Sequence, residues 1–147
     1  MAVSVSTITT NIWDAIQTII SGNTTVDNNS TAVYGTYPQQ FIDSAGGLPM
    51  VIVHKPEVTE QRITMTKKKF LISIRIESFT DNAAGLKVLS DAVRNALETN
   101  KVTTRGSNQL YHFKIVEDTE DFDLRANKRV HRNILGASYE FVGGGDL

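Results

Sequence analysis

One run of alternating side chains, residues 69–79, constrains the fold of this chain most strongly. Its two alternating sets are Phe70, Ile72, Ile74 and Ile76 on one side, and Leu71, Ser73, Arg75 and Glu77 on the other. Side chains of a β-strand point alternately to the two faces of a sheet, so this period of two indicates a strand. One face enters a core and the other stays partly exposed to water, which means that the strand needs a covering layer on one side.

Two amphipathic helices can supply that layer. The first is expected over about residues 8–21, where isoleucines recur at steps of three and four. The second follows the alternating strand, is capped by Thr80 or Asp81, and ends near Thr99. Its apolar stripe is formed by Leu86, Leu89, Val93 and Leu97. Each stripe is wide enough to pack one helix on the sheet.

Further runs have the composition of strands, at 32–37, 48–53, 58–65, 110–116 and 129–142. The run at 48–53 is almost continuously apolar, which fits a strand covered on both faces. The run at 58–65 is separated from the strand at 69–79 by so few residues that the two form a hairpin. Its turn is expected at 66–68.

The last of these strands has an irregular pattern. Val130 and Ile134 share one parity, whereas the later apolar residues share the other: Leu135, Ala137, Tyr139 and Phe141. A β-bulge at 134–136 would re-aim the later side chains, and Gly136 can adopt the backbone angles that a bulge requires. The alternative is a bend that gives each half of the strand a different partner.

Polar segments connect these elements. The segments at 23–31 and 100–108 are expected to be flexible loops because they have little apolar area to bury, and 143–147 is expected to be a flexible tail. The acidic segment at 117–123 is expected to connect the last two strands. The length fits a single domain, 1–147. The order of elements predicts an α+β fold: a mixed or antiparallel sheet, two helices packed on one face, and a protruding β-hairpin.

Composition argues against several classes of protein. Fifteen basic and 16 acidic residues give a formal charge of −1, so the chain has no net cationic field for duplex DNA or an anionic membrane. The absence of cysteine excludes disulfides, thiolate metal sites and cysteine nucleophiles. Apolar runs fall short of the ~20 residues that span a bilayer, and the N-terminal segment lacks the features of a secretory signal. We therefore expect a soluble protein with no membrane partner.

No motif points to catalysis, a cofactor or a metal. His54, His112 and His131 fall in expected strands, without the i,i+2 or i,i+4 spacing that would aim two imidazoles at one ion. No G-x-S-x-G elbow is present. The glycines at 143–145 are not followed by Lys-Ser/Thr or a helix, so they do not form a phosphate loop. We expect a protein that is not an enzyme and has no cofactor.

Two charged features are candidate interaction sites. Lys67, Lys68 and Lys69 lie at the expected hairpin tip, where they could contact an acidic partner or protect the hairpin from pairing with other strands. The second feature is a reversal of polarity, with acidic Glu117, Asp118, Glu120, Asp121 and Asp123 followed by basic Arg125, Lys128, Arg129, His131 and Arg132. Such a segment can pair with itself in a hairpin or with the next copy of the chain.

The expected elements follow one another in a distinctive layout. An N-terminal helix containing Trp13 precedes the apolar strand at 48–53, a charged hairpin and the I-S-I-R-I strand. A short polar turn at 80–82 then leads into the second helix, and two closing strands end in A-S-Y-E-F at 137–141. In this layout, which covers most of the chain, the sequence resembles the tail terminator (tail completion) proteins of long-tailed bacteriophages.

The resemblance implies a structural role in a virion. Family members look like subunits of a hexameric ring that caps the finished tail tube, stops its polymerisation and offers a surface to head-completion or neck proteins. The implied partners are further copies of the chain, the tail tube protein and a neck protein, with genomic DNA passing through the lumen unread. The implied location is the head-proximal end of the tail, after assembly in the host cytoplasm.

A closed ring needs complementary patches on opposite sides of one subunit. The expected pair is the lysine group at 67–69 and the acidic stretch at 117–123, with Arg125 and Arg129 beside it. Two alternatives stay open. The chain could be a neck, head-completion or tail tube subunit, or a small nucleic-acid- or ligand-binding domain that uses the lysine hairpin, which steep salt dependence of DNA binding would reveal.

Overall fold

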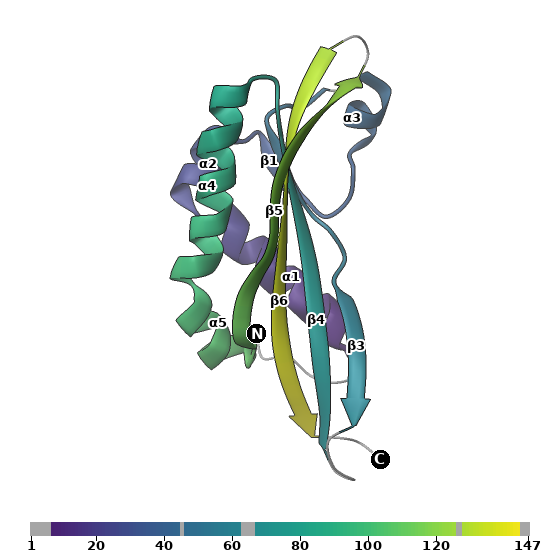
Figure 1. Cartoon of the computed structure of the whole chain (residues 1–147), viewed down its shortest axis with the longest axis vertical. Helices are drawn as coiled ribbons and strands as arrows, with labels where there is room; N and C mark the ends of the chain where they lie inside the picture. The colour runs from purple at the N-terminus through teal and green to yellow at the C-terminus, as the bar shows by residue number, and fades with distance from the viewer. Residues whose placement is uncertain (1–6, 45, 63–66, 126–127, 145–147) are drawn as a thin grey trace.

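The computed structural model describes residues 7–44, 46–62, 67–125 and 128–144 (Figure 1). In chain order the elements are α1 (Ile8–Ser21), α2 (Thr24–Asn29), β1 (Ala32–Tyr34), α3 (Gln39–Ser44), β2 (Met50–Val53), β3 (Glu57–Arg62), β4 (Lys67–Thr80), α4 (Ala83–Thr99), α5 (Lys101–Asn108), β5 (Tyr111–Arg125) and β6 (Lys128–Gly144). The fold is α+β with a mixed sheet, as predicted.

The sheet is organised around its two long central strands, β4 and β6. The strand order is β1-β2-β4-β6-β5, and β3 also pairs with β4. β6 accompanies β4 along its whole length, from Lys67 opposite Gly144 to Thr80 opposite His131. The other edge of β4 is shared end to end by β3 and β2. β1 and β2 form the parallel pair, and the remaining pairs are antiparallel.

The main core lies between one face of the sheet and the helices α1 and α4. Ile12, Ile16 and Ile20 of α1 are fully buried there, and the predicted stripe of α4 is buried as well. They pack on the even-numbered face of β4 and on the later apolar residues of β6. Moving each large side chain out of water contributes about 1.5–3 kcal/mol, so this core is the principal source of stability.

A second, smaller core covers part of the opposite face. Its buried members are Phe41 of α3, Met50, Ile52, Phe79 and Val130. The rings of Phe41 and Phe79 lie 4.8 Å apart between centroids. This explains the continuous apolar run of β2, because Val51 and Val53 face the main core while Met50 and Ile52 face the second one. Helices therefore contact both faces, not one face alone.

The two cores also explain the irregular pattern of the last strand. Val130 belongs to the second core and Leu135 to the main one, while the β4–β6 register runs unbroken past Gly136. The predicted bulge in β6 is therefore wrong. The irregularity lies on β5, where Ile115 pairs with Ala137 and Glu117 with Gly136, so that Val116 is the extra residue.

Gly136 makes room for that extra residue. A Cβ atom at Gly136 would lie 3.3 Å from Val116 Cγ2 and 3.2 Å from Glu117 Cβ, tighter than ordinary contact. Glycine at this position thus lets β5 approach closely where its ladder is irregular.

Both segments expected to be flexible loops contain helices. In α2 the Asn23 side chain accepts a hydrogen bond from the Val26 amide at 3.1 Å, and Val26 is fully buried in the main core. In α5 Thr104 is 1% exposed, and its hydroxyl donates to the Asn100 carbonyl at 2.8 Å. The loop predictions at 23–31 and 100–108 are wrong because a single buried side chain anchors each helix.

Other boundaries also differ from the sequence predictions. Asn82, not Thr80 or Asp81, caps α4 by accepting from the Gly85 amide at 2.5 Å. β4 already begins at Lys67, so the predicted turn at 66–68 is misplaced. β3 and β4 nevertheless form the predicted hairpin, whose connection at 63–66 lies outside the described residues. The predicted tail at 143–147 begins inside β6, and 145–147 also lie outside them.

The acidic segment is a strand, not a connection. β5 runs on through 117–123 to Arg125 and pairs with β6 in a long hairpin. Figure 1 shows this hairpin rising past the start of α4. In the described part of the chain, no helix is both long and apolar enough to cross a membrane.

Candidate functional site

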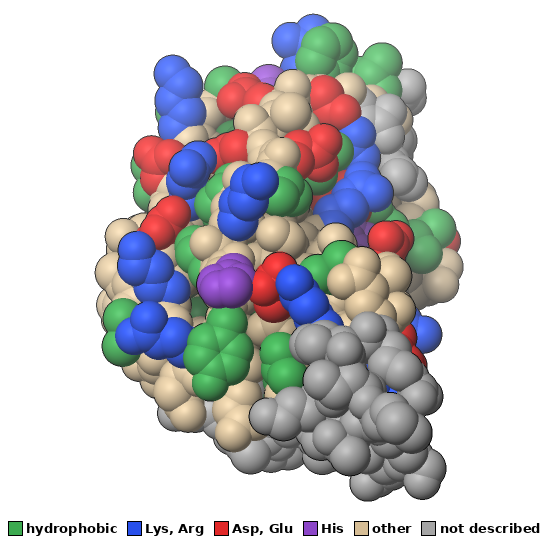
Figure 2. Space-filling model, turned by 60° about the horizontal axis from the view of Figure 1, so that its bottom comes forward, with side chains coloured by type: hydrophobic (Ala, Val, Ile, Leu, Met, Phe, Trp, Pro, Cys, Tyr) green, Lys and Arg blue, Asp and Glu red, His purple; other side chains and the backbone are tan. Residues whose placement is uncertain are grey.

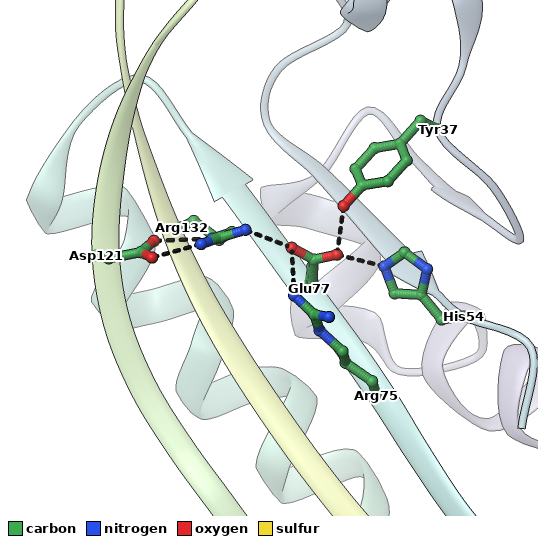
Figure 3. A network of polar contacts seen from close by, with 6 residues as sticks. All are labelled: Tyr37, His54, Arg75, Glu77, Asp121 and Arg132. Atoms are coloured by element: carbon green, nitrogen blue, oxygen red, sulfur yellow. Dashed lines mark hydrogen bonds and ion pairs between the residues drawn. The ribbon is translucent and has the colours of Figure 1, made fainter. Parts of the chain in front are cut away.

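A buried carboxylate, Glu77, organises the polar face of the sheet. Glu77 lies on β4, on the face opposite the main core, and its side chain is 0% exposed. Arg75 of the same strand and four residues from other parts of the chain converge with it into what we name the Glu77 network: Tyr37, His54, Arg75, Glu77, Asp121 and Arg132 (Figure 3). A buried charge of this kind is tolerated only when it is paired and hydrogen-bonded.

Each oxygen of Glu77 has two partners. Oε1 accepts a hydrogen bond from the Tyr37 hydroxyl at 2.6 Å and contacts His54 Nε2. Oε2 lies 3.1 Å from a guanidinium nitrogen of Arg132 and 3.5 Å from one of Arg75. The carboxylate is therefore saturated, which leaves it no free lone pair directed at a ligand.

Arg132 extends the network to the edge of the sheet. Its Nε donates to Asp121 Oδ1 at 2.8 Å, and its second terminal nitrogen contacts Asp121 Oδ2. The pair is bidentate, the strongest geometry for a guanidinium and a carboxylate. The network thus connects β5, β6 and β4 with the chain after β2 and with the segment before α3 (Figure 3).

The surroundings of Glu77 and Tyr37 fix the protonation of these two side chains at neutral pH. Burial alone would raise the pKa of Glu77, but hydrogen bonds from His54 and Tyr37 and the charge of Arg75 bring that pKa down to about 2. Burial and the hydrogen bond to Glu77 raise the pKa of Tyr37 to about 12. The hydrogen bond from Arg132 lowers the pKa of Asp121. A general acid or base must exchange a proton near pH 7, and neither Glu77 nor Tyr37 does so.

A shallow hollow of about 390 Å³ lies beside the network on the same face. Its lining includes His54, Lys55, Arg75, Val116 and Glu117. Within the described residues, no group of three or more His, Asp or Glu side chains is placed to hold a metal ion. The arrangement is best suited to holding strands and the α3 segment in fixed positions.

Two members of the lysine group are paired with carboxylates of the same chain. Lys68 Nζ lies 2.9 Å from Glu60 Oε1, and Lys69 Nζ lies 3.1 Å from Glu140 Oε1. Glu140 also contacts His112, and its pKa is lowered by Lys69 and His112. Lys67 belongs to β4 and pairs with Gly144 in the ladder. On the face shown in Figure 2, basic and acidic side chains are interspersed and do not separate into patches of one sign.

The acidic stretch is paired in part. Asp118 Oδ2 accepts from Arg94 of α4 at 2.8 Å, and Asp121 is held by Arg132. Glu117 and Glu120 are exposed on β5. The guanidinium of Arg129 lies 4.8 Å from the centre of the Phe122 ring, within the range of a cation–π contact.

The structure does not bring the lysine group and the acidic stretch together within the chain. Lys67 lies opposite Gly144 at one end of β6, whereas Asp123 lies opposite Val130 near the other end. Arg125 lies opposite Lys128 at the end of the same ladder. The acidic and basic parts of the polarity reversal lie on the two paired strands of the β5–β6 hairpin. This is the first of the two alternatives that the sequence left open.

Comparison with known proteins finds similarity among solved structures. No family model matches the sequence, and no curated protein matches it. Among solved structures, the fold is similar to that of a chain in the virion of a native gene transfer agent particle, with a TM-score of 0.60. The two chains are 16% identical, and the match covers 88% of this chain and 94% of the other. At this identity the match establishes a shared fold across nearly the whole of both chains.

Proposed function

We propose that this chain is a structural protein of a phage or phage-like virion, and specifically a tail terminator subunit. The observation that carries the proposal is the fold shared with a virion chain along 88% of this chain and 94% of that one. The order of strand, hairpin, strand and helix by which the sequence resembles tail terminators is also the order in the fold.

The polar face supports a structural role. The most deeply buried charge, Glu77, is saturated by partners and stays ionised at neutral pH. A saturated carboxylate holds strands in place but does not accept a proton from a substrate. In this proposal the Glu77 network keeps the subunit rigid, so that its edges present fixed surfaces to neighbours.

The proposed assembly is a hexameric ring at the head-proximal end of the tail. Each subunit would contact two neighbours through two different surfaces, the tube through one end and a neck protein through the other. Genomic DNA would pass through the lumen without sequence readout. The contact between the lysine group of one copy and the acidic stretch of the next stays a prediction. Internal pairs of Lys68 and Lys69 would compete with that contact, so its contribution is expected to be small.

The test is the mass of the purified full chain across concentration, by native mass spectrometry, followed by an assay of tube growth. Six subunits of 16.2 kDa give a mass of about 97 kDa. A discrete hexamer that stops the polymerisation of a cognate tail tube protein is the expected result. A monomer that neither binds tube ends nor alters tube length would refute the proposal.

A neck, head-completion or tail tube subunit is the second candidate, because the same fold match supports any component of a virion. The tube assay separates the possibilities. A terminator binds at tube ends and fixes length, a tube subunit is incorporated along the tube, and a neck protein binds only after the end is capped.

A further inference from the structure

The outer edge of β5 is a long strand edge that carries no further strand among the described residues. β5 ends the strand order, and among the described residues it pairs with β6 alone. Every residue from 116 to 122 is exposed, as is Leu124. The backbone groups on the outer side of such a strand can form a ladder with an added strand.

Exposed apolar side chains distinguish this edge from a merely protected one. Charged residues on an edge strand usually prevent unwanted pairing. β5 nevertheless exposes Val116 (55%), Phe122 (60%) and Leu124 (66%) along the same stretch. Large exposed apolar side chains favour association, so they would weaken an edge whose only role is to prevent pairing. They would instead anchor a partner strand.

The two faces of this edge differ in chemistry. Residues opposite each other in an antiparallel pair share a face, so the register assigns the side chains of β5. Glu117 and Asp121 lie opposite Gly136 and Arg132, on the face of the Glu77 network. Asp118, Glu120, Phe122 and Leu124 lie on the other face, where the hairpin rises past α4 (Figure 1). Arg94 already pairs with Asp118. A fitting strand would therefore be basic on the network face and opposite Glu120, and apolar opposite Phe122 and Leu124.

None of the described strands would let a second copy of the chain supply such a partner. β5 against β5 would bring two acidic edges together. At the opposite side of the sheet, β1 is too short to form a long ladder, because it has three residues. The sequence of β3 contains two acidic residues, Glu57 and Glu60, and one basic residue, Arg62, so it is not a basic strand. The lysines of β4 lie in the interior of the sheet, between β3 and β6, and have no free edge. The described strands therefore favour a complementary strand from another protein.

We propose that the outer edge of β5, from Val116 to Leu124, is a strand-addition site for an extended segment of a different protein that alternates basic and apolar residues. Main-chain hydrogen bonds would supply affinity, and the acidic and apolar faces would set orientation and specificity. The site does not require the ring proposed above.

The probe is a fluorescein-labelled octapeptide of alternating lysine and valine, measured by anisotropy against the full chain at low salt. We expect saturable binding that falls at least about tenfold in Glu117→Lys/Glu120→Lys, which reverses two exposed charges without touching an ion pair of the network. The matched control is Asp14→Lys/Asp91→Lys, the same charge change at exposed sites on α1 and α4, which should change affinity less than about twofold. A peptide with every backbone amide N-methylated keeps its charge but has no N–H group on either edge to donate to a ladder, and it should not bind.

Several results would overturn the inference. If the N-methylated peptide binds as tightly as the unmodified one, charge attraction alone explains the binding and no strand is added. If the β5 variant and the control variant bind the peptide equally, the acidic side chains of β5 do not contribute to binding. If the wild-type chain is hexameric and Glu117→Lys/Glu120→Lys dissociates it, the edge belongs to the contact between copies, and the ring stands without this site. If the chain never forms a hexamer but binds the peptide as described, the site stands and the ring falls.

Discussion

Glu77→Gln tests whether the Glu77 network stabilises the protein through its charge. The substitution keeps the size of the side chain and can still accept a hydrogen bond, but it removes the negative charge that faces Arg132 and Arg75. It leaves both cores intact. Any loss of stability therefore reports the electrostatic part of the network.

The pKa of Glu77 sets the magnitude. That pKa falls from an ordinary 4.5 to about 2 on folding, and each unit corresponds to about 1.4 kcal/mol, so the ionised form adds about 3 kcal/mol to the free energy of unfolding at pH 7. Because the folded pKa is the lower one, this stability is complete above pH 4.5 and is lost as the pH falls toward 2. At pH 3 about 1.4 kcal/mol remains.

Urea unfolding of wild type and Glu77→Gln at pH 7 and pH 3, followed by circular dichroism, measures both numbers. We expect a difference in unfolding free energy of about 3 kcal/mol at pH 7 that shrinks by about 2 kcal/mol at pH 3. Glu57→Gln, at an exposed position on β3, is the control and should change stability by less than about 0.5 kcal/mol. A Glu77→Gln difference below 1 kcal/mol at pH 7, or one that does not change with pH, would refute the reasoning.

Two further predictions concern the main core. Val93 is 1% exposed, so Val93→Asp buries an unpaired charge and should leave the chain unfolded or insoluble. The control is Val88→Asp, at a 46% exposed position of the same helix, which should melt within a few degrees of wild type. Normal melting of Val93→Asp would show that the face assigned to α4 is wrong. The Tyr139 hydroxyl is buried with no hydrogen-bond partner among the described residues, and burial raises its pKa. Tyr139→Phe should therefore be neutral or should stabilise the protein by up to about 1 kcal/mol in urea unfolding, and a loss of more than 1 kcal/mol would mean that the hydroxyl has a partner.

The main core could be predicted from the sequence because periodicity alone determines it. The alternation at 69–79 and the stripe from Leu86 to Leu97 each match one period over many residues, and both face the main core as expected. The helices α2 and α5 could not be predicted in the same way. Each owes its place to one anchor, Val26 or Thr104, in an otherwise polar segment, and tertiary contacts decide the conformation of such short segments.

The part of β5 beyond Val116 was predicted as a connection and not as a strand because it lacks any periodic pattern. Beyond Val116 both faces of the strand are exposed, so no alternation of apolar and polar residues distinguishes it from a connection. Its pairing with β6 determines its conformation. The sequence indicated the pairing only through the reversal of charge between 117–123 and 125–132.

The Glu77 network was not predicted because its members are far apart in the chain. Forty residues separate Tyr37 from Glu77, and 55 separate Glu77 from Arg132. Glu77 carried the one local signal, an acidic residue within a strand of isoleucines, and that signal fits an exposed face equally well. Only the second core, which places the α3 segment over this face, shows that the carboxylate is buried.

The position of β6 has a consequence for the order in which the chain can fold during synthesis. β6 is the last element along these residues, yet it lies in the interior of the sheet between β4 and β5. While the ribosome is still translating residues 128–144, the helices and the β3–β4 hairpin can form, but β4 and β5 have no strand between them. Residues 128–144 therefore complete both the sheet and the main core. A nascent chain halted before residue 128 would leave the long edge of β4 unpaired and would expose the part of α4 that packs on β6.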